Sequence, residues 1–574
     1  MFDSKSSANT RVIARFGPAC LGALIVLCLL AGTAAPLLAQ TPQEGPGGPI
    51  LVVTNYEFPF NYYYAEILRT EGFNEFEVID ARDVHLGTMD PYDVVILAET
   101  YLSPLYPAKF EQYLAQGGNV IAFRPDPLLY ELFGVTAAGD TLHDGYLQID
   151  DSAAPGQGLV GETIQYHGPA ELYDLDGAAA LATLYSDAVT PTANPAVTLL
   201  DYGENGGQVA VFAYDLARSV ALTRQGNPDW AAQDRDGDGR IRTNDLFVGD
   251  TPGVDDWIDL DKVHIPQADE QQRLLSNLIL HMNRNQMPLP RFWYFPSGHK
   301  AVVLLTEDNH GTTWSMNRFD QHLAESPPDC VLEDWECVRS SAYIYSGNPM
   351  TDTEAAYYDA LGFEISIHTN TGCDTPWPDL PALQAIYDVQ FPAFVAAYPS
   401  IPSPLSERAH CVTWADYDSR PIVQFGYGIR LDVTYYYERV TEWQIDAHPG
   451  MFTGSGLPMR FTDLDGDMVD VFQATTQMTD ESGQTYPHTI DALLDKALGP
   501  EGYYGAFTAN MHADYEQSNG SYNSPVIVSA CLSRGVPVIT ARQMLTWLDA
   551  RNASSWQNLA WDGTTLSCDV VQAP

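Results

Sequence analysis

The sequence predicts an α/β protein in which a parallel-sheet domain is followed by a (β/α) barrel. Short aliphatic runs alternate with amphipathic helical segments along most of the chain, as in parallel sheets joined by right-handed crossovers. Residues 301–305 form a continuous apolar run, which is typical of a strand buried on both faces. Several runs in the second half lead into His or Asp, and barrel enzymes carry their sites at the carboxyl ends of strands.

The first 39 residues predict a secretory signal peptide. Lys5, Arg11 and Arg15 precede an apolar stretch over residues 19–31, and small residues lead to Ala39. We expect cleavage after Ala39 and a secreted, cell-surface or periplasmic protein. The alternative is an uncleaved membrane anchor, because the apolar region extends almost to the cleavage site. Residues 40–48 are rich in Pro and Gly and predict a linker.

Residues 49–287 predict the first domain. Strands are expected at 49–54, 77–79, 94–98 and 119–123, with helices at 62–70 and 108–115. Residues 140–225 are predicted to be β-rich, an amphipathic helix is expected at 265–282, and Pro288 and Pro290 mark the boundary. This region resembles the flavodoxin-like domains of class I glutamine amidotransferases. Those enzymes need a cysteine at a strand-to-helix turn, and this region has none, so the resemblance implies a scaffold without that chemistry.

A calcium-binding loop is predicted within this domain at residues 234–245. Carboxylates fall at loop positions 1, 3, 5 and 12, with a glycine at position 6 that permits the turn. The residues of interest are Asp234, Asp236, Asp238, Arg240 at position 7 and Asp245. Asp245 replaces the usual bidentate Glu, and the alternative is an exposed acidic loop. A bound calcium would be structural.

The chain is strongly acidic and has an even number of cysteines after the predicted cleavage. Its 75 Asp and Glu residues against 28 Lys and Arg give a formal net charge of −47, which argues against nucleic-acid binding. Disulfides are expected in an exported chain, with metal ligation as the alternative. The pairs considered are Cys330–Cys337, Cys373–Cys411 and Cys531–Cys568.

Residues 288–560 predict the barrel, and residues 561–574 a tail. Beyond 301–305, strands are expected at 342–345, 364–367, 504–510 and 537–539, with a turn or strand at 422–425 and 429–432. Helices are expected at 353–361, 381–398, 490–498, 525–534 and 541–551. Residues 301–305 lead to Asp308, 364–367 to His368, and 504–510 to His512, so these side chains should meet at one edge.

Taken in order, these segments resemble the polysaccharide deacetylases of carbohydrate esterase family 4. The segments are Thr306-Glu307-Asp308-Asn309, residues 362–369 with His368, Arg408-Ala409-His410, Asp432, and Met511-His512. The resemblance covers residues 288–560 and implies a distorted barrel with fewer than eight strands. It implies hydrolysis of N- or O-acetyl groups on a carbohydrate, assisted by a divalent transition metal such as zinc.

The resemblance also implies roles for individual residues. Asp308 falls on the catalytic base, His512 on the general acid, and Arg408 on the group that orients the base. Asn309 stands where the family has a ligand Asp, and Gly372 where it has a second histidine. With Asn309 and His368 alone the site would lack a ligand, so His310 and His410 are the available replacements. A Cys373–Cys411 bridge would bring His410 close.

Other roles are open for these residues. Asp308 could cap a helix, His310 could bond to its loop, and Arg408 and His410 could join a network with Asp416 or Asp418. Glu307, Asp432 and Asp514 are further site residues, although Asp432 could instead pair with Arg430 or Arg439. Two functional alternatives follow. The barrel could bind glycans without catalysis, or it could be a glycoside hydrolase using Asp308 and Asp432.

Overall fold

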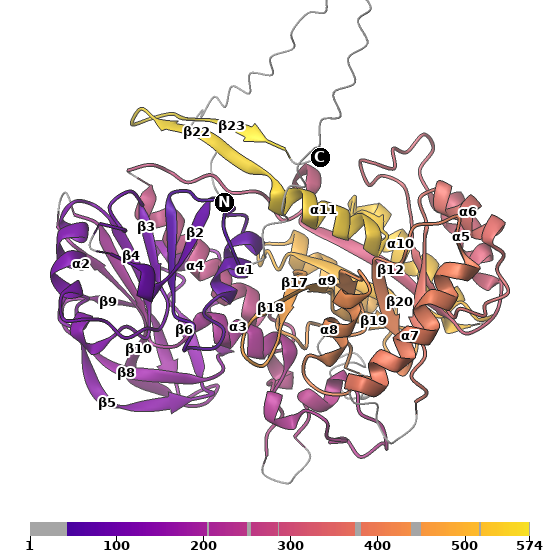
Figure 1. The fold of residues 1–574 in the computed structure, drawn as a ribbon, viewed down its shortest axis with the longest axis horizontal. Coiled ribbons are helices and arrows are strands. Elements are labelled where there is room, and N and C mark those ends of the chain that lie inside the picture. The colour runs from indigo at the N-terminus through magenta and orange to yellow at the C-terminus, as the bar shows by residue number, and fades with distance from the viewer. Residues whose placement is uncertain are drawn as a thin grey trace, which may run out of the picture.

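A computed structural model describes residues 43–85, 87–203, 206–249, 254–284, 286–373, 380–437, 449–515 and 518–572. The predicted signal peptide lies outside the described residues. The chain forms two α/β lobes that lie side by side, with a C-terminal hairpin projecting over the first (Figure 1). In the described residues, no helix combines the length and the apolar character needed to cross a membrane.

The first lobe is built on a mixed sheet. Its strand order is β2-β1-β3-β4-β11-β10-β9-β6-β7, and the first five strands are parallel in the order typical of flavodoxin-like domains. The other four pair antiparallel, and β5 pairs β8 in a separate sheet. The strands are β1 (Ile50–Thr54), β2 (Phe76–Asp80), β3 (Val94–Leu97), β4 (Asn119–Phe123), β5 (Val135–His143), β6 (Tyr146–Ile149), β7 (Thr163–Gln165), β8 (Pro169–Leu175), β9 (Ala179–Tyr185), β10 (Pro191–Asp201) and β11 (Gln208–Phe212).

The helices of this lobe are α1 (Tyr63–Thr70), α2 (Tyr106–Ala115), α3 (Leu216–Gln225) and α4 (Gln267–Asn283). The expectation of β structure through residue 225 is wrong at its end, because α3 occupies the last part. Asp215 caps that helix by accepting hydrogen bonds from the backbone amides of Ala217 and Arg218. Its aliphatic side chains are buried in the core of the first lobe.

The second lobe is built on a curled, mainly parallel sheet. Its order is β17-β18-β16-β15-β14-β13-β12-β20-β19, with β21 also pairing β12. Only Ala474 and Thr475 separate β18 from β19 in the sequence. Because β18 lies near one end of the strand order and β19 at the other, the sheet curls toward a barrel. All nine residues of β12 are buried, which confirms the strand predicted from its apolar run.

The strands of this lobe are β12 (Ala301–Asn309), β13 (Ser341–Ile344), β14 (Glu364–Thr369), β15 (Ser406–Ala409), β16 (Leu431–Asp432), β17 (Met459–Thr462), β18 (Met468–Gln473), β19 (Thr476–Thr479), β20 (Gly505–Asn510) and β21 (Val538–Ile539). The helices are α5 (Trp314–Glu325), α6 (Asp352–Ala360), α7 (Leu380–Ala397), α8 (Ser419–Gly426), α9 (His488–Leu498), α10 (Asn519–Arg534) and α11 (Ala541–Ala553). Residues 422–425 lie in α8, so the expectation of a turn or strand there is wrong. The predicted tail boundary at 560 falls inside a hairpin of β22 (Ser555–Trp561) and β23 (Leu566–Val571).

The two lobes share a buried interface. Trp414 and Tyr435 of the second lobe belong to the hydrophobic core of the first. Arg460 forms an ion pair with Glu66 at 2.8 Å, and the Tyr63 hydroxyl donates to the Arg460 carbonyl oxygen. The lobes therefore hold each other in place, and the second lobe in isolation would expose part of this core.

Two of the three predicted disulfides are present. Cys330 bonds to Cys337, and Cys373 bonds to Cys411. The third pairing is wrong, because Cys531 is a free thiol in the core of the second lobe and Cys568 lies free on β23.

Candidate active site

The carboxyl ends of the parallel strands bring the predicted site residues together. His368 on β14 lies opposite Arg408 on β15, and β12 pairs with β20 up to the Thr306–Asn510 pair. His310, His410 and His512 follow these strand ends. They surround a cavity of about 380 Å³. Its lining residues are Arg240, Arg242, Asp308, His310, Arg408, His410, Cys411, Val412, Tyr436, Thr479, Glu481 and His512.

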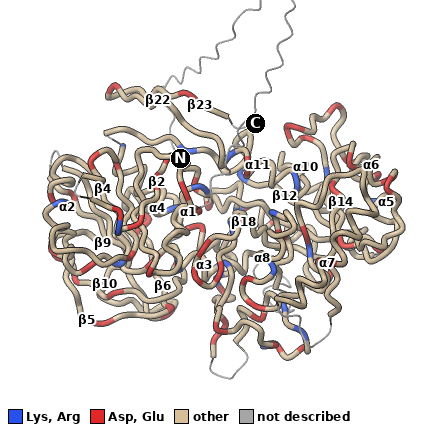
Figure 2. Tube along the Cα trace, in the orientation of Figure 1, with Lys and Arg blue, Asp and Glu red and all other residues tan. Residues whose placement is uncertain are grey.

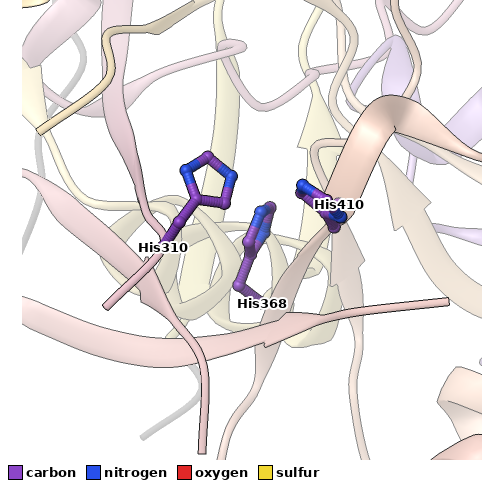
Figure 3. Close-up of side chains that lie close together, drawn as sticks. All are labelled: His310, His368 and His410. Carbon is purple, nitrogen blue, oxygen red and sulfur yellow. The ribbon is translucent and has the colours of Figure 1, made fainter. Parts of the chain in front are cut away.

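Three histidines form a candidate metal-binding group at this edge. His310, His368 and His410 each offer a ring nitrogen, and these atoms lie within 4.8 Å of one another (Figure 3). Their ring centroids are 4.9–5.4 Å apart. The Tyr345 ring lies 5.4–5.6 Å from all three and encloses the group.

The hydrogen bonds of these histidines involve Nδ1 of each ring and leave Nε2 as the nitrogen that could bind a metal. Nδ1 of His310 lies 2.8 Å from the Asp514 carboxylate, Nδ1 of His368 lies 2.8 Å from the Arg408 carbonyl oxygen, and Nδ1 of His410 lies 3.1 Å from Oδ1 of Asn370. A ring that donates through Nδ1 keeps the lone pair of Nε2 available for a metal. Nε2 of His368 is buried and has no hydrogen-bond partner in the described part of the chain. This orphaned atom fits a bound cation.

Burial keeps two of the rings neutral. Burial, together with the charge of nearby His310, lowers the pKa of His368 to about 3 and that of His410 to about 4. Burial also opposes protonation of His310, but its hydrogen bond to the Asp514 carboxylate and the charge of Asp308 raise its pKa above the ordinary value. Neutral imidazole is the form that ligates metals.

Asp308 lies beside this group as a buried carboxylate. Its Oδ2 accepts hydrogen bonds of 3.1 Å from Nε of Arg408 and from the Asn510 amide, while its Oδ1 has no hydrogen bond within the described residues. Burial alone would raise its pKa, but His368, Arg408 and His512 together hold the pKa well below the ordinary value. The group is therefore ionised and has a free oxygen.

His512 faces Asp308 from the end of β20. Its Nδ1 lies 2.8 Å from Asp480, and its Nε2 lies 4.0 Å from Oδ2 of Asp308. Burial opposes protonation, but the Asp480 hydrogen bond and the negative charges of Asp308, Asp480 and Glu481 raise its pKa to about 9. The ring is protonated at neutral pH, so it can donate a proton from Nε2.

The turn that carries His410 has an unusual backbone. Cys411 has φ 59° and Val412 has φ 46°, values that L residues rarely adopt and that are especially unfavourable for a β-branched side chain. The Cys373–Cys411 bridge ties this turn to the loop after β14 that carries Asn370. The predicted bridge is therefore present beside His410, which lies in the histidine group. Backbone strain of this kind is typical of functional sites.

The structure does not bring every predicted residue into the cavity. The Asn309 amide donates to Ser315 and Ala513, and its oxygen accepts from Gly311, Thr312 and Asn348, so it stabilises the loop and is not one of the grouped ligands. Glu307 is directed toward α5, near Ser315 and Arg318, and burial raises its pKa to about 8.

The two remaining predicted carboxylates, Asp432 and Asp514, differ in their position relative to the cavity. Asp432 is buried away from the cavity, where its oxygens accept hydrogen bonds from Gln424 and Thr434. Arg430 pairs with Asp470 and Asp549 instead, and Arg439 lies outside the described residues. The separation of Asp432 from the cavity argues against a pair of catalytic carboxylates with Asp308. Asp514 lies at the histidine group, where its carboxylate contacts Nδ1 of His310.

The sequence alone did not reveal Asp480 or Tyr345 as site residues. Asp480 follows β19, a strand that the sequence pattern did not predict. Tyr345 follows β13 and lay at the end of a predicted strand, so the strand-end rule could have found it.

The predicted calcium loop also lies at this site. Carboxylate oxygens of Asp234, Asp236 and Asp245 lie within 4.8 Å of one another and form a second candidate metal-binding group. Asp238 instead forms an ion pair with Arg242, and the Arg240 side chain reaches the cavity.

Comparisons with known proteins are weak. No protein-family model and no curated protein sequence matches the chain. A solved structure titled "T48 deacetylase with substrate" aligns at 12% identity over 43% of this chain and 91% of that chain, with a TM-score of 0.26. The β-galactosidases of Rahnella sp. R3 and Bacillus circulans align at 22% and 16% identity, over 29% and 30% of this chain and 28% and 30% of theirs, both with a TM-score of 0.25. The chain thus spans less than a third of those β-galactosidases, and similarity of this extent assigns neither fold nor activity.

Proposed function

We propose that this protein is a metal-dependent hydrolase that removes acetyl groups from a carbohydrate. One observation carries the proposal. His310, His368 and His410 offer nitrogens within 4.8 Å of one another, directly beside an ionised Asp308 and a protonated His512. Three histidine ligands with an open position, a base and an acid are the parts that hydrolysis of an amide or ester needs.

A divalent metal at these histidines would polarise the acetyl carbonyl and make water a stronger nucleophile. Asp308 takes the proton from the attacking water through its free Oδ1. Arg408 keeps that carboxylate ionised and fixes its orientation through the 3.1 Å hydrogen bond to Oδ2. His512 then donates the proton on Nε2 to the leaving amine or alkoxide. Asp308 afterwards releases its proton to solvent, and the His512 ring regains a proton from solvent, a charge state that its hydrogen bond to Asp480 favours.

The ligand set favours zinc. Three imidazole nitrogens with an open fourth position are a known catalytic zinc arrangement, and the partners at Nδ1 fix the orientation of each ring. We also propose calcium for the loop of Asp234, Asp236 and Asp245, because hard carboxylate oxygens suit that ion. Two disulfides support the further proposal that the protein is exported.

Acetate release from acetylated oligosaccharides tests the function. The wild-type chain loaded with zinc should release acetate, and a chelator should abolish release until zinc is restored. His368→Ala should lose the activity, while the exposed His143→Ala serves as a matched control. If the zinc-loaded protein binds acetylated glycans but leaves every acetyl group in place, it is a glycan-binding protein and the enzymatic proposal fails.

A further inference from the structure

The first lobe contributes two arginines to the cavity of the second. The loop at residues 234–245 extends across the interface, where the backbone amide of Trp414 donates to the Ile241 carbonyl oxygen and Arg242 bridges to Thr413. The Thr243 hydroxyl donates to the Tyr436 carbonyl oxygen on the other side of the loop. The loop is therefore fixed to the catalytic lobe, and Arg240 and Arg242 line the cavity beside His410.

Most charges in this cavity have a partner of opposite sign. Arg408 pairs with Asp308, Arg242 pairs with Asp238, and His512 pairs with Asp480 and Glu481. Arg240 differs from these groups. Its Nε donates to the Cys373 carbonyl oxygen at 2.9 Å, and no ion pair to it exists among the residues that the structure describes.

This hydrogen bond engages Nε, and the two terminal amino groups have no hydrogen-bond partner among the described residues. A planar pair of N–H donors matches the two oxygens of a carboxylate or sulfate. Acidic residues are spread over both lobes and basic ones are few (Figure 2). Arg240 is therefore a cation placed where a substrate would lie.

We propose that Arg240 binds an anionic group of the substrate, so that the acetylated carbohydrate is an acidic glycan carrying carboxylate or sulfate groups. This inference rests on the proposed acetyl hydrolase for the identity of the cavity. Arg242 positions the loop, because its Nε donates to the Cys411 carbonyl oxygen and its charge is paired with Asp238. The first lobe thus determines specificity for a reaction performed by the second.

Binding of deacetylated oligosaccharides to the whole chain tests the inference without requiring hydrolysis. Calorimetry compares tetragalacturonate, which carries carboxylates, with a sulfated galactan tetrasaccharide and a neutral xylotetraose. Arg240→Gln should weaken binding of one anionic ligand about 10- to 100-fold, since a charged hydrogen-bonded contact contributes that much. Neutral xylotetraose should be unaffected. Arg284→Gln removes the same charge from an exposed site and should change nothing.

The outcomes separate this inference from the proposed function. Loss of binding for tetragalacturonate or for the sulfated ligand supports the proposal and identifies the anionic group. Equal binding by wild type and Arg240→Gln, or no binding of either anionic ligand, overturns it. Arg240→Lys keeps the charge without the paired donors and should give an intermediate affinity, which excludes misfolding as the cause. Arg240-dependent binding without acetate release would contradict the proposed hydrolase while still supporting the anion site.

Discussion

Replacement of Asp480 by Asn should shift the alkaline limb of the pH profile. The carboxylate accepts from Nδ1 of His512 at 2.8 Å and from its backbone amide, and the pKa of the ring is raised to about 9 from an ordinary 6.5. That difference corresponds to about 3 kcal/mol in favour of the protonated ring. Asn keeps the shape and an acceptor oxygen but removes the charge, so only electrostatic stabilisation is lost.

The expected change follows from the role of His512 as the acid. Activity needs the protonated ring and is lost as pH rises through its pKa, so kcat/KM of the wild type should fall near pH 9. In Asp480→Asn this fall should occur about 1–2 pH units lower, the usual effect of removing one close charge. Acetate release between pH 5.5 and 10 measures it.

Glu481→Gln is the matched control for this experiment. Glu481 lies 3.6 Å from Nε2 of His512, but its side chain is 58% exposed, so solvent screens it and the shift should be much smaller. An unchanged alkaline limb in Asp480→Asn would refute the assignment of His512 as the acid. Loss of activity at every pH together with loss of metal would instead show that Asp480 only maintains the geometry.

Three further predictions concern groups around the cavity. Arg408→Met leaves the buried carboxylate of Asp308 without its cation, so urea unfolding should show a loss of about 3–5 kcal/mol and acetate release should fall far more than in Arg408→Lys. Removal of the Cys373–Cys411 bridge, which spans 38 residues, should cost about 3–4 kcal/mol and weaken zinc binding in a competition assay, whereas removal of the other disulfide should leave zinc affinity unchanged. Burial raises the pKa of Glu307 to about 8, so the folded state holds this proton more tightly than the unfolded state does. The stability that this proton contributes is therefore lost as pH rises from 4.5 toward 8. Glu307→Gln should raise the melting temperature at pH 9 and leave it unchanged at pH 4.

Sequence reasoning found the residues that follow clear strand signals. Apolar runs located β12, β14 and β20, and the strand-end rule then placed Asp308, His368 and His512 at one edge. Asn309 was misjudged because neighbouring residues on a strand point to opposite faces, and Asn309 points away from Asp308 into a loop network.

Other features depended on tertiary contacts that no local pattern contains. Asp480 was missed because β19 is short and continues from β18 through a break of two residues. Arg240 fits a cation-loop motif by spacing, but its side chain acts on the other lobe, which only the packing of the two lobes reveals. In the segment at 422–425 only Val423 and Gln424 are buried, so packing of these two side chains, rather than local propensity, accounts for its helical state.

The metal content of the whole purified chain tests the central claim most directly. The whole chain is required because the lobes share a core and the first supplies part of the cavity. After incubation with zinc and removal of free metal, we predict about one equivalent of zinc in the wild type, in His143→Ala and in a chain with the calcium loop disabled by Asp234→Asn. His368→Ala should retain almost none. Absence of zinc from the wild type, or equal zinc in His368→Ala, would contradict the metal centre and with it the proposed hydrolase.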